Sequence, residues 1–300
     1  MPTFTGMPLD RAQTLRKDPN WIARQLGARS SRAAAASTAG VLLDASTDTV
    51  ARRRLPPAWP ETDEAILLGL EGESALFAVD LESVPPAEAA ELQAQTRLVN
   101  LREAGARLSQ PEGGLAAYVV ALLNWHRTHH FCANCGGPSV AVEGGYARRC
   151  LTCETLHFPR TDPVVIMLVE NDGQLLLGRR SGWPGRRYSV LAGFVSPGES
   201  AEEAVLREVR EESGIRAYAP EFVASQPWPF PSSLMLGFEA RADGGQPLNH
   251  DGELDDVRWF THDEVRGASA GDNVDLKLPP SVSVARFLID RWLGGHRPRG

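Results

Sequence analysis

Six glutamates fall within the 23 residues from Gly193 to Ile215. Glu211 and Glu212 lie three and four positions after Glu208, so a helix would project these three carboxylates from one side. Carboxylates crowded in this way repel one another. A hard divalent cation such as Mg²⁺ or Mn²⁺, which prefers oxygen ligands, removes that conflict. Such an ion also lowers the charge on a phosphoryl group and activates water, so the chemistry indicated is metal-assisted phosphoryl hydrolysis.

The only four cysteines of the chain form a second cluster, with two residues inside each pair and fourteen between the pairs. They are Cys132, Cys135, Cys150 and Cys153. Two such turns direct backbone amides at thiolate sulfur and complete a closed, structural Zn²⁺ tetrahedron. A nucleic-acid-binding ribbon and four unrelated reduced thiols are the less favoured alternatives. Because four thiolates complete the tetrahedron, we expect surface or packing roles for His126, His129 and His130.

A third segment whose residues could bind a ligand runs from Ser225 to Ser233, with prolines at alternate positions. Proline fixes φ and removes a backbone donor, which predicts a stiff loop and excludes a helix or a central strand. Trp228 and Phe230 offer flat faces for packing or base stacking. Polar groups for hydrogen bonds to a ligand come from Gln226, Ser232 and Ser233. Taken alone, the segment is better explained as a proline-rich turn with core aromatics.

The glutamates need a helix to position them, and the flanking residues predict one. Ser200 and Glu203 have the spacing of a capping box, and Gly214 stands where a glycine ends a helix. Its buried stripe is expected to consist of Ala201, Ala204, Val205 and Val209. The usual explanation of a Glu-rich helix is a solvated acidic face. Here the flanking glycines, the capping box and Arg207 make that explanation the poorer one.

Mixed strands and helices are expected on both sides of the cysteines. The first hundred or so residues indicate a small α+β or β-rich region, with strands at 65–70 and 75–81 and a mobile loop at 29–40. A helix with one buried face is predicted at 115–127. The second half should contain a hairpin turn at 171–173 and a helix at 283–293. Its strands are expected at 164–170, 174–179, 188–195, 217–225, 234–242 and 257–260.

Composition narrows the class of protein. A hydrophobic content of 42% is enough for real cores in a 300-residue chain. A net charge of −7 and a pI near 5.6 argue against broad, non-specific nucleic-acid binding and leave a local basic groove open. No signal peptide is recognisable, and the longest apolar runs, such as 115–123, are too short to span a bilayer. A cytoplasmic protein without membrane contact is therefore expected.

The segment Gly193–Ile215 contains every fixed position of the Nudix box, GX5EX7REUXEEXGU with U aliphatic. Together with the SQPWPFP segment and the preceding Cys₄ motif, it resembles the NADH pyrophosphatase (NudC-type) subfamily of Nudix hydrolases. The resemblance implies an α/β fold, a Nudix α/β/α sandwich preceded by a zinc ribbon and an N-terminal α+β domain. It places the N-terminal domain at 1–125, the zinc ribbon at 126–158 and the Nudix domain at 159–300.

That resemblance also implies roles for individual residues. The catalytic glutamates would be Glu208, Glu211 and Glu212, with Arg207 holding a neighbouring glutamate. Ligands of the catalytic Mg²⁺ or Mn²⁺ would be the carbonyl of Ala192 and the carboxylates of Glu208, Glu212 and Glu253. Phe158, where the subfamily commonly has tyrosine, and Phe194 would sandwich the nicotinamide ring. The remaining substrate contacts would be Gln226, Pro227, Trp228, Pro229, Phe230, Pro231, Ser232, Ser233 and Ala285.

Three functions follow from these features. The first is hydrolysis of the pyrophosphate of NAD(H) to AMP and NMN(H). The second uses the same residues to remove NAD caps from RNA and requires a basic path leading out of the pocket. The third is a zinc-ribbon binding or scaffold module without catalysis, which the intact set of glutamates disfavours. A homodimer is expected from the resemblance.

Overall fold

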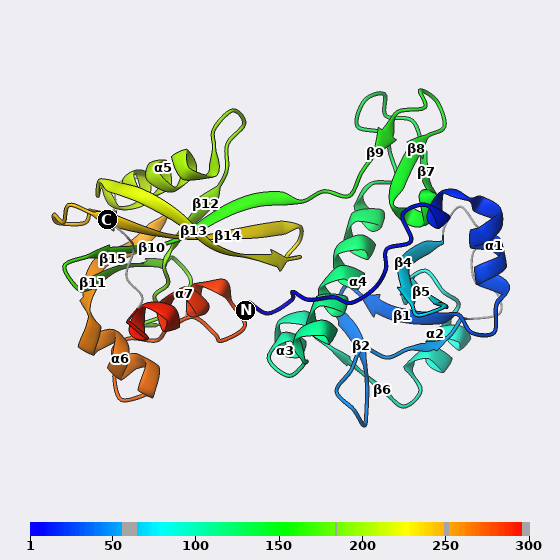
Figure 1. Cartoon of the computed structure of the whole chain (residues 1–300), viewed down its shortest axis with the longest axis horizontal. Helices are drawn as coiled ribbons and strands as arrows, with labels where there is room; N and C mark the ends of the chain where they lie inside the picture. Colours follow the sequence, from blue (N-terminus) through cyan, green and yellow to red (C-terminus); the bar gives the residue numbers. More distant parts are fainter. Residues whose placement is uncertain (56–64, 184, 249–251, 296–300) are drawn as a thin grey trace. The chain divides into compact units, whose positions relative to one another are not determined.

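The computed structural model describes residues 1–55, 65–183, 185–248 and 252–295. It divides into two compact units (Figure 1). One unit comprises residues 1–3, 162–227 and 233–300, and we call it the C-terminal unit. The other comprises residues 4–161 and 228–232, and we call it the N-terminal unit. The acidic helix lies in the first and the cysteines in the second.

The C-terminal unit is built on a six-stranded sheet in the order β13-β14-β10-β11-β15, with β12 paired to β10. Its strands are β10 (Asp162–Asn171), β11 (Gln174–Arg180), β12 (Leu191–Phe194), β13 (Ala217–Trp228), β14 (Ser233–Ala242) and β15 (Leu254–Thr261). β10 and β14 run parallel, and β10 pairs antiparallel with both β11 and β12. The helices are α5 (Ala201–Ser213), α6 (His262–Ala270) and α7 (Val284–Leu293).

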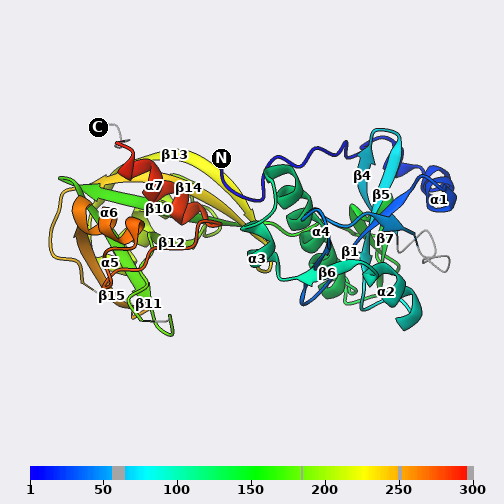
Figure 2. The same cartoon turned by 90° about the horizontal axis from the view of Figure 1, so that it is seen from below.

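Alternate residues of β10 enter two separate cores, one on each face of this sheet. Val165, Met167 and Val169 pack in a cluster with the buried residues of α5. Ile166 and Leu168 pack in a second cluster with residues of α6 and α7. Successive side chains of a strand point to opposite faces, so the sheet lies between helical layers (Figures 1 and 2). The expected α/β/α sandwich is confirmed.

The N-terminal unit has its own six-stranded sheet in the order β4-β5-β1-β2-β6, with β3 paired to β1. These strands are β1 (Arg32–Ser37), β2 (Gly40–Asp44), β3 (Arg53–Arg54), β4 (Ile66–Glu71), β5 (Ser74–Asp80) and β6 (Thr96–Val99). The helices are η1 (Leu15–Lys17), α1 (Pro19–Gly27), α2 (Pro86–Gln93), α3 (Leu101–Gly105) and α4 (Gln110–Thr128). A second, three-stranded sheet consists of β7 (Ser139–Val142), β8 (Ala147–Cys150) and β9 (Leu156–His157), with η2 (Glu143–Gly145) after β7.

Most predicted elements are present, but residues 29–40 and 188–195 differ from their predictions. Residues 29–40 are not a mobile loop, because β1 crosses them and Ala33 to Ala36 are fully buried between β5 and β2. A strand buried on both faces shows no alternation, and alanine has little strand propensity, so neither signal appears in the sequence. The predicted strand at 188–195 is shorter, since only Leu191–Phe194 is a strand.

The proline-rich segment is also more regular than a loop. β13 continues through Ser225 to Trp228, and β14 resumes at Ser233. β13 is the last strand in the order of its sheet, and an edge strand tolerates prolines because one row of its backbone groups has no partner strand. The exclusion of a central strand was therefore correct, but the stiff loop is limited to residues 229–232.

Candidate active site

Helix α5 begins and ends where its sequence predicts. The backbone N–H of Glu203 donates to Ser200 Oγ at 3.2 Å, and the N–H of Ser200 donates to Glu203 Oε2 at 2.7 Å. Gly214 ends the helix in the left-handed conformation, with φ of 69°. Ala204, Val205 and Val209 are buried as expected, and Ala201 packs at the edge of the same cluster. The cap and this buried stripe fix which residues of α5 face away from the core.

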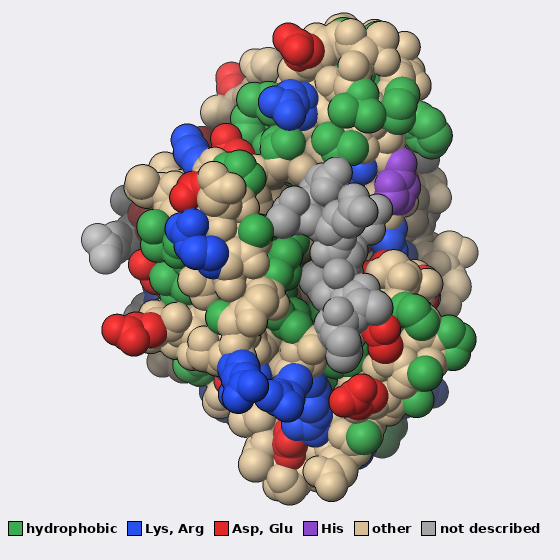
Figure 3. All heavy atoms as spheres, turned by 90° about the vertical axis from the view of Figure 1, so that its right-hand side faces the viewer, with side chains coloured by type: hydrophobic (Ala, Val, Ile, Leu, Met, Phe, Trp, Pro, Cys, Tyr) green, Lys and Arg blue, Asp and Glu red, His purple; other side chains and the backbone are tan. Residues whose placement is uncertain are grey.

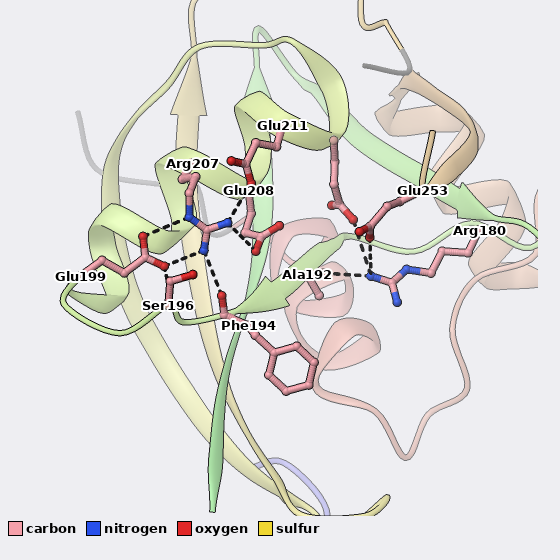
Figure 4. Close-up of polar contacts among 10 residues, drawn as sticks. Arg180, Ala192, Phe194, Ser196, Glu199, Arg207, Glu208, Glu211 and Glu253 are labelled. Atoms are coloured by element: carbon pink, nitrogen blue, oxygen red, sulfur yellow. Dashed lines mark hydrogen bonds and ion pairs between the residues drawn. The ribbon is translucent and has the colours of Figure 1, made fainter. Parts of the chain in front are cut away.

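Arg207 joins several acidic residues through one guanidinium (Figure 4). It donates to Glu199 at 2.5 and 3.0 Å, to Glu208 at 2.8 Å and to Glu211 at 2.8 Å. A further hydrogen bond of 2.9 Å reaches the carbonyl of Phe194 on β12. The hydrogen bonds from Arg207 lower the pKa of Glu199 to about 2. Arg207 therefore ties α5 to the turn before it and to β12, which agrees with the role expected for it.

Glu208 lies directly against the backbone of β12. A Cβ added to Gly193 would be 1.9 Å from Glu208 Cδ, so only glycine leaves room for this carboxylate. Burial raises the pKa of Glu208; the hydrogen bond from Arg207 opposes this, and the nearby Glu211 and Glu253 add to it. Burial thus disfavours the ionised carboxylate despite its hydrogen bond from Arg207, and a bound cation would stabilise it.

Arg180, at the end of β11, contacts a second group of oxygen atoms (Figure 4). Its Nη2 donates to the carbonyl of Ala192 at 3.1 Å and lies 3.6 Å from Glu212 Oε1 and 4.0 Å from Glu253 Oε2. The side chain of Glu212 is only 2% exposed. Carboxylates and a backbone carbonyl are the donors that Mg²⁺ and Mn²⁺ prefer. The residues present therefore fit a hard divalent cation.

Three residues of this unit that were expected to contact substrate differ in their surroundings. The ring of Phe194 is exposed and points away from Arg207 (Figure 4). Gln226 is fully buried, where its amide donates to the carbonyls of Thr3 and Val282 and accepts from the N–H of Val284. This differs from the expectation that Gln226 offers hydrogen bonds to a ligand, because its polar groups hold the start of α7. Ala285 is buried in the same helix.

The aromatic residues of the proline-rich segment pack together within the N-terminal unit. The rings of Trp228 and Phe230 meet edge to face at 4.9 Å, and Phe4 lies 6.1 and 6.4 Å from them. The guanidinium of Arg102 lies 3.9 Å over the Phe230 ring. Pro229 is buried beside them, whereas Phe158 is exposed. The other predicted contacts are Pro227 in β13, exposed Pro231, half-buried Ser232 and Ser233 at the start of β14.

The four cysteine sulfurs lie within 4.8 Å of one another. Cys132 and Cys153 are 3.6 Å apart and Cys135 and Cys150 are 3.5 Å apart, close to the spacing of about 3.8 Å in a tetrahedron with Zn–S bonds of about 2.3 Å. The amide of Asn134 points at Cys132 Sγ, and those of Thr152 and Cys153 point at Cys150 Sγ. The predicted four-cysteine cluster is confirmed, and its geometry is consistent with structural zinc.

The histidines before this cluster have the packing roles expected of them. His126 is buried, and its Nε2 lies 2.9 Å from the carbonyl of Gly145 while Arg148 lies 3.0 Å from its Nδ1. His129 bonds to the carbonyl of Trp125. A histidine that the sequence did not single out, His157, places Nε2 3.1 Å from Cys132 Sγ.

Comparison with known proteins agrees with this architecture. The NUDIX domain family matches residues 159–279, the NADH pyrophosphatase zinc ribbon domain matches 127–158, and the NADH pyrophosphatase-like rudimentary NUDIX domain matches 30–125. The fold and the acidic helix thus define a Nudix pyrophosphohydrolase that carries a zinc ribbon.

The relatives define the family more closely. The chain is 37% identical to the NAD-capped RNA hydrolase NudC of Mycobacterium bovis, over 97% of this chain and 95% of that protein. The same figures hold for the protein of that name in Mycobacterium tuberculosis. The human NAD-capped RNA hydrolase NUDT12 is 41% identical over 62% of this chain and 43% of its own length. The chain belongs to the NudC family, the NADH pyrophosphatase kind of Nudix hydrolase.

Helix length and polarity also bear on the membrane prediction. Among the described residues, none of the helices has both the length and the apolar character needed to cross a membrane.

Proposed function

We propose that this protein hydrolyses the pyrophosphate bond of an NAD moiety, giving AMP or a 5′-adenylate end together with NMN(H). The observation that carries the proposal is the set of oxygen donors around α5. Glu208, Glu212, Glu253 and the carbonyl of Ala192 would hold a divalent cation, which supplies charge neutralisation for the pyrophosphate and an activated water. Glu211 would orient that water or act as a further ligand.

NAD-capped RNA is the substrate that the relatives favour. Both mycobacterial relatives and the human protein bear the name NAD-capped RNA hydrolase. Free NAD(H) presents the same pyrophosphate to the same residues, so it remains the second candidate. On the face drawn in Figure 3, basic side chains stand next to acidic ones with hydrophobic side chains between them. Removal of caps from RNA would require a basic path leading out of the site.

The chain's own residues supply orientation and rigidity. Arg207 fixes Glu208 and Glu211 relative to the carbonyl of Phe194, so these carboxylates are positioned before substrate arrives. Phe194 offers an exposed aromatic ring on the strand next to the glutamates, which suits stacking on a base or nicotinamide. The cysteine cluster would hold Zn²⁺ in a structural role, and the expected homodimer stays a prediction.

The test is product analysis of the purified protein with Mg²⁺ or Mn²⁺, with NADH, NAD⁺, ADP-ribose and a short NAD-capped RNA offered in parallel. Glu212→Gln should lower the rate on every cleaved substrate by about 100-fold or more, because a buried ligand carboxylate is lost. Glu202→Gln is the matched control, since Glu202 is an exposed residue in the first turn of the same helix.

The ratio of kcat/KM on capped RNA to kcat/KM on free NADH decides between the two substrates. A ratio well above one supports removal of RNA caps, and a ratio well below one supports the small-molecule reaction. Retention of most activity in Glu212→Gln would refute the assignment of the site. Failure of the wild-type protein to cleave any of the four compounds would refute the proposed function.

A further inference from the structure

Two arginines reach into the acidic site, and they are held in different ways. Arg207 makes hydrogen bonds of 2.5 to 3.0 Å to its partners, and its side chain is 28% exposed. Arg180 makes one hydrogen bond of 3.1 Å and two longer ion pairs of 3.6 and 4.0 Å, and its side chain is 46% exposed. Arg207 is therefore a fixed part of the site, whereas Arg180 is held loosely.

The acceptors that Arg180 contacts are shared with the proposed metal site. Ala192, Glu212 and Glu253 are three of the four groups that would hold the divalent cation. A guanidinium and a metal ion held close to the same oxygens repel each other, so each weakens the binding of the other there. Arg180 and the cation are therefore expected to compete for these oxygens.

The burial of Glu212 explains why a positively charged side chain such as Arg180 stabilises the site before a metal binds. Glu212 is only 2% exposed, and a buried carboxylate without a counter-charge is strongly destabilising. The pairing with a half-exposed arginine at 3.6 Å is at the same time weak, because water screens it and the long side chain must be ordered. Arg180 can thus neutralise Glu212 and still be displaced at low cost.

The position of Arg180 in the sheet is also unusual. It is the last residue of β11, and the pairing of β11 with β15 shifts register between Arg179 and Arg180. Such irregularities in a sheet re-aim side chains and occur next to active sites. Arg179, the preceding residue, pairs with Asp255 at 3.4 Å, so the two neighbouring arginines have separate partners.

We propose that Arg180 is an exchangeable counter-ion of the metal site, which neutralises Glu212 and competes with the divalent cation for the oxygens of Ala192, Glu212 and Glu253. Arg180 moves away from these oxygens when the cation binds and thereby weakens the apparent affinity for it. The inference rests on the proposed function in one respect, the identity of the metal ligands. It adds a residue that sets metal affinity without being a ligand.

The test measures Mn²⁺ binding to chelator-treated protein without substrate, by calorimetry and by the electron paramagnetic resonance signal of free Mn²⁺. Arg180→Gln should bind Mn²⁺ about three- to tenfold more tightly than wild type, since the competing charge is gone. Arg179→Gln is the matched control, because it removes the same charge from the same strand, and its affinity should equal that of wild type. Arg180→Lys, which keeps the charge, should lie between them.

A second readout is the melting temperature of each protein with chelator and with saturating Mn²⁺. Arg180→Gln should melt below wild type in chelator and approach it in Mn²⁺, because the metal then neutralises Glu212. Wild-type or weaker Mn²⁺ affinity in a folded Arg180→Gln would overturn the inference. If Arg180→Gln does not fold, Arg180→Lys takes its place, and an Mn²⁺ affinity in Arg180→Lys that is no tighter than that of wild type would overturn the inference. Glu212→Gln separates the two hypotheses, because unchanged Mn²⁺ binding in that variant would refute the ligand assignment itself.

Discussion

Gly193 lets a carboxylate lie against a strand. Any side chain at this position would meet Glu208, since a Cβ would be 1.9 Å from its Cδ. The group that must give way is the end of a flexible side chain, so Gly193→Ala should displace the Glu208 carboxylate and spare the fold. We expect kcat to fall by about 100-fold while the free energy of unfolding changes by less than about 1 kcal/mol.

Activity assays and urea denaturation of Gly193→Ala check this prediction. Gly267→Ala is a suitable control, because Gly267 lies within α6 and its added Cβ would make an ordinary contact of 3.5 Å with Asn273. An active Gly193→Ala protein would show that Glu208 has room to move without loss of function. Loss of both activity and stability in Gly193→Ala would show that Gly193 is needed for folding.

The sequence predicted the residue types of this site better than their surroundings. The capping box and the spacing of three and four residues placed the glutamates on α5 correctly. Arg180 was missed because it is far from the helix in sequence, and only the pairing of β11 with its neighbours brings it to Glu212. Gln226 was predicted to contact a ligand, because the residues of the α7 region that bury it are more than 50 positions away in the sequence.

At the scale of elements, His126 connects α4 to the three-stranded sheet. Its ring lies between the carbonyl of Gly145 and the guanidinium of Arg148 on β8. Burial lowers the pKa of His126 to about 4, with a smaller contribution from Arg148 in the same direction. The unfolded chain has an ordinary histidine pKa of 6.5, so between pH 6.5 and 4 protons bind the unfolded state more tightly.

Stability should therefore be fully present above pH 6.5 and should fall as the pH drops towards 4. The histidine contributes up to roughly 3 kcal/mol of this loss, given the two pKa values. Urea unfolding of wild type and of His126→Gln between pH 7.5 and 4.5 measures it, and the glutamine variant should show a shallower slope. His130→Gln, which changes an exposed histidine, should keep the wild-type slope. Equal slopes in all three proteins would refute the assignment to His126.

The sequence predicted strand β10 but missed strand β1, and the side chains of the two strands explain the difference. β10 contains valine, isoleucine and leucine, which suit a pleated surface, and its bounds were nearly correct. β1 consists mainly of alanine, whose small side chains fit between neighbouring strands and a helix but carry no strand signal. Only packing within the N-terminal unit distinguishes such a run from a loop.

At the scale of the whole molecule, each unit has hydrophobic clusters of its own. Val165 and Ile166 belong to the two clusters of the C-terminal unit, whereas Ala33 and Ile22 belong to clusters of the N-terminal unit. The cysteine cluster lies entirely in the N-terminal unit. Loss of the proposed zinc should therefore destabilise that unit and leave the glutamate helix with its own support.

Calorimetry of the protein as purified and after zinc removal by chelation at moderate denaturant tests this expectation. Cys132 and Cys150 are buried, so we also expect zinc loss to make their thiols accessible to a thiol reagent. We expect one transition to move down by roughly 10 °C or more, because structural zinc contributes several kcal/mol to the fold that it closes. The other transition should stay in place, and Cys150→Ser should reproduce the shift without a chelator. A uniform shift of the whole scan would show instead that both units unfold together, and an unchanged scan would mean that the four thiols do not hold a structural metal.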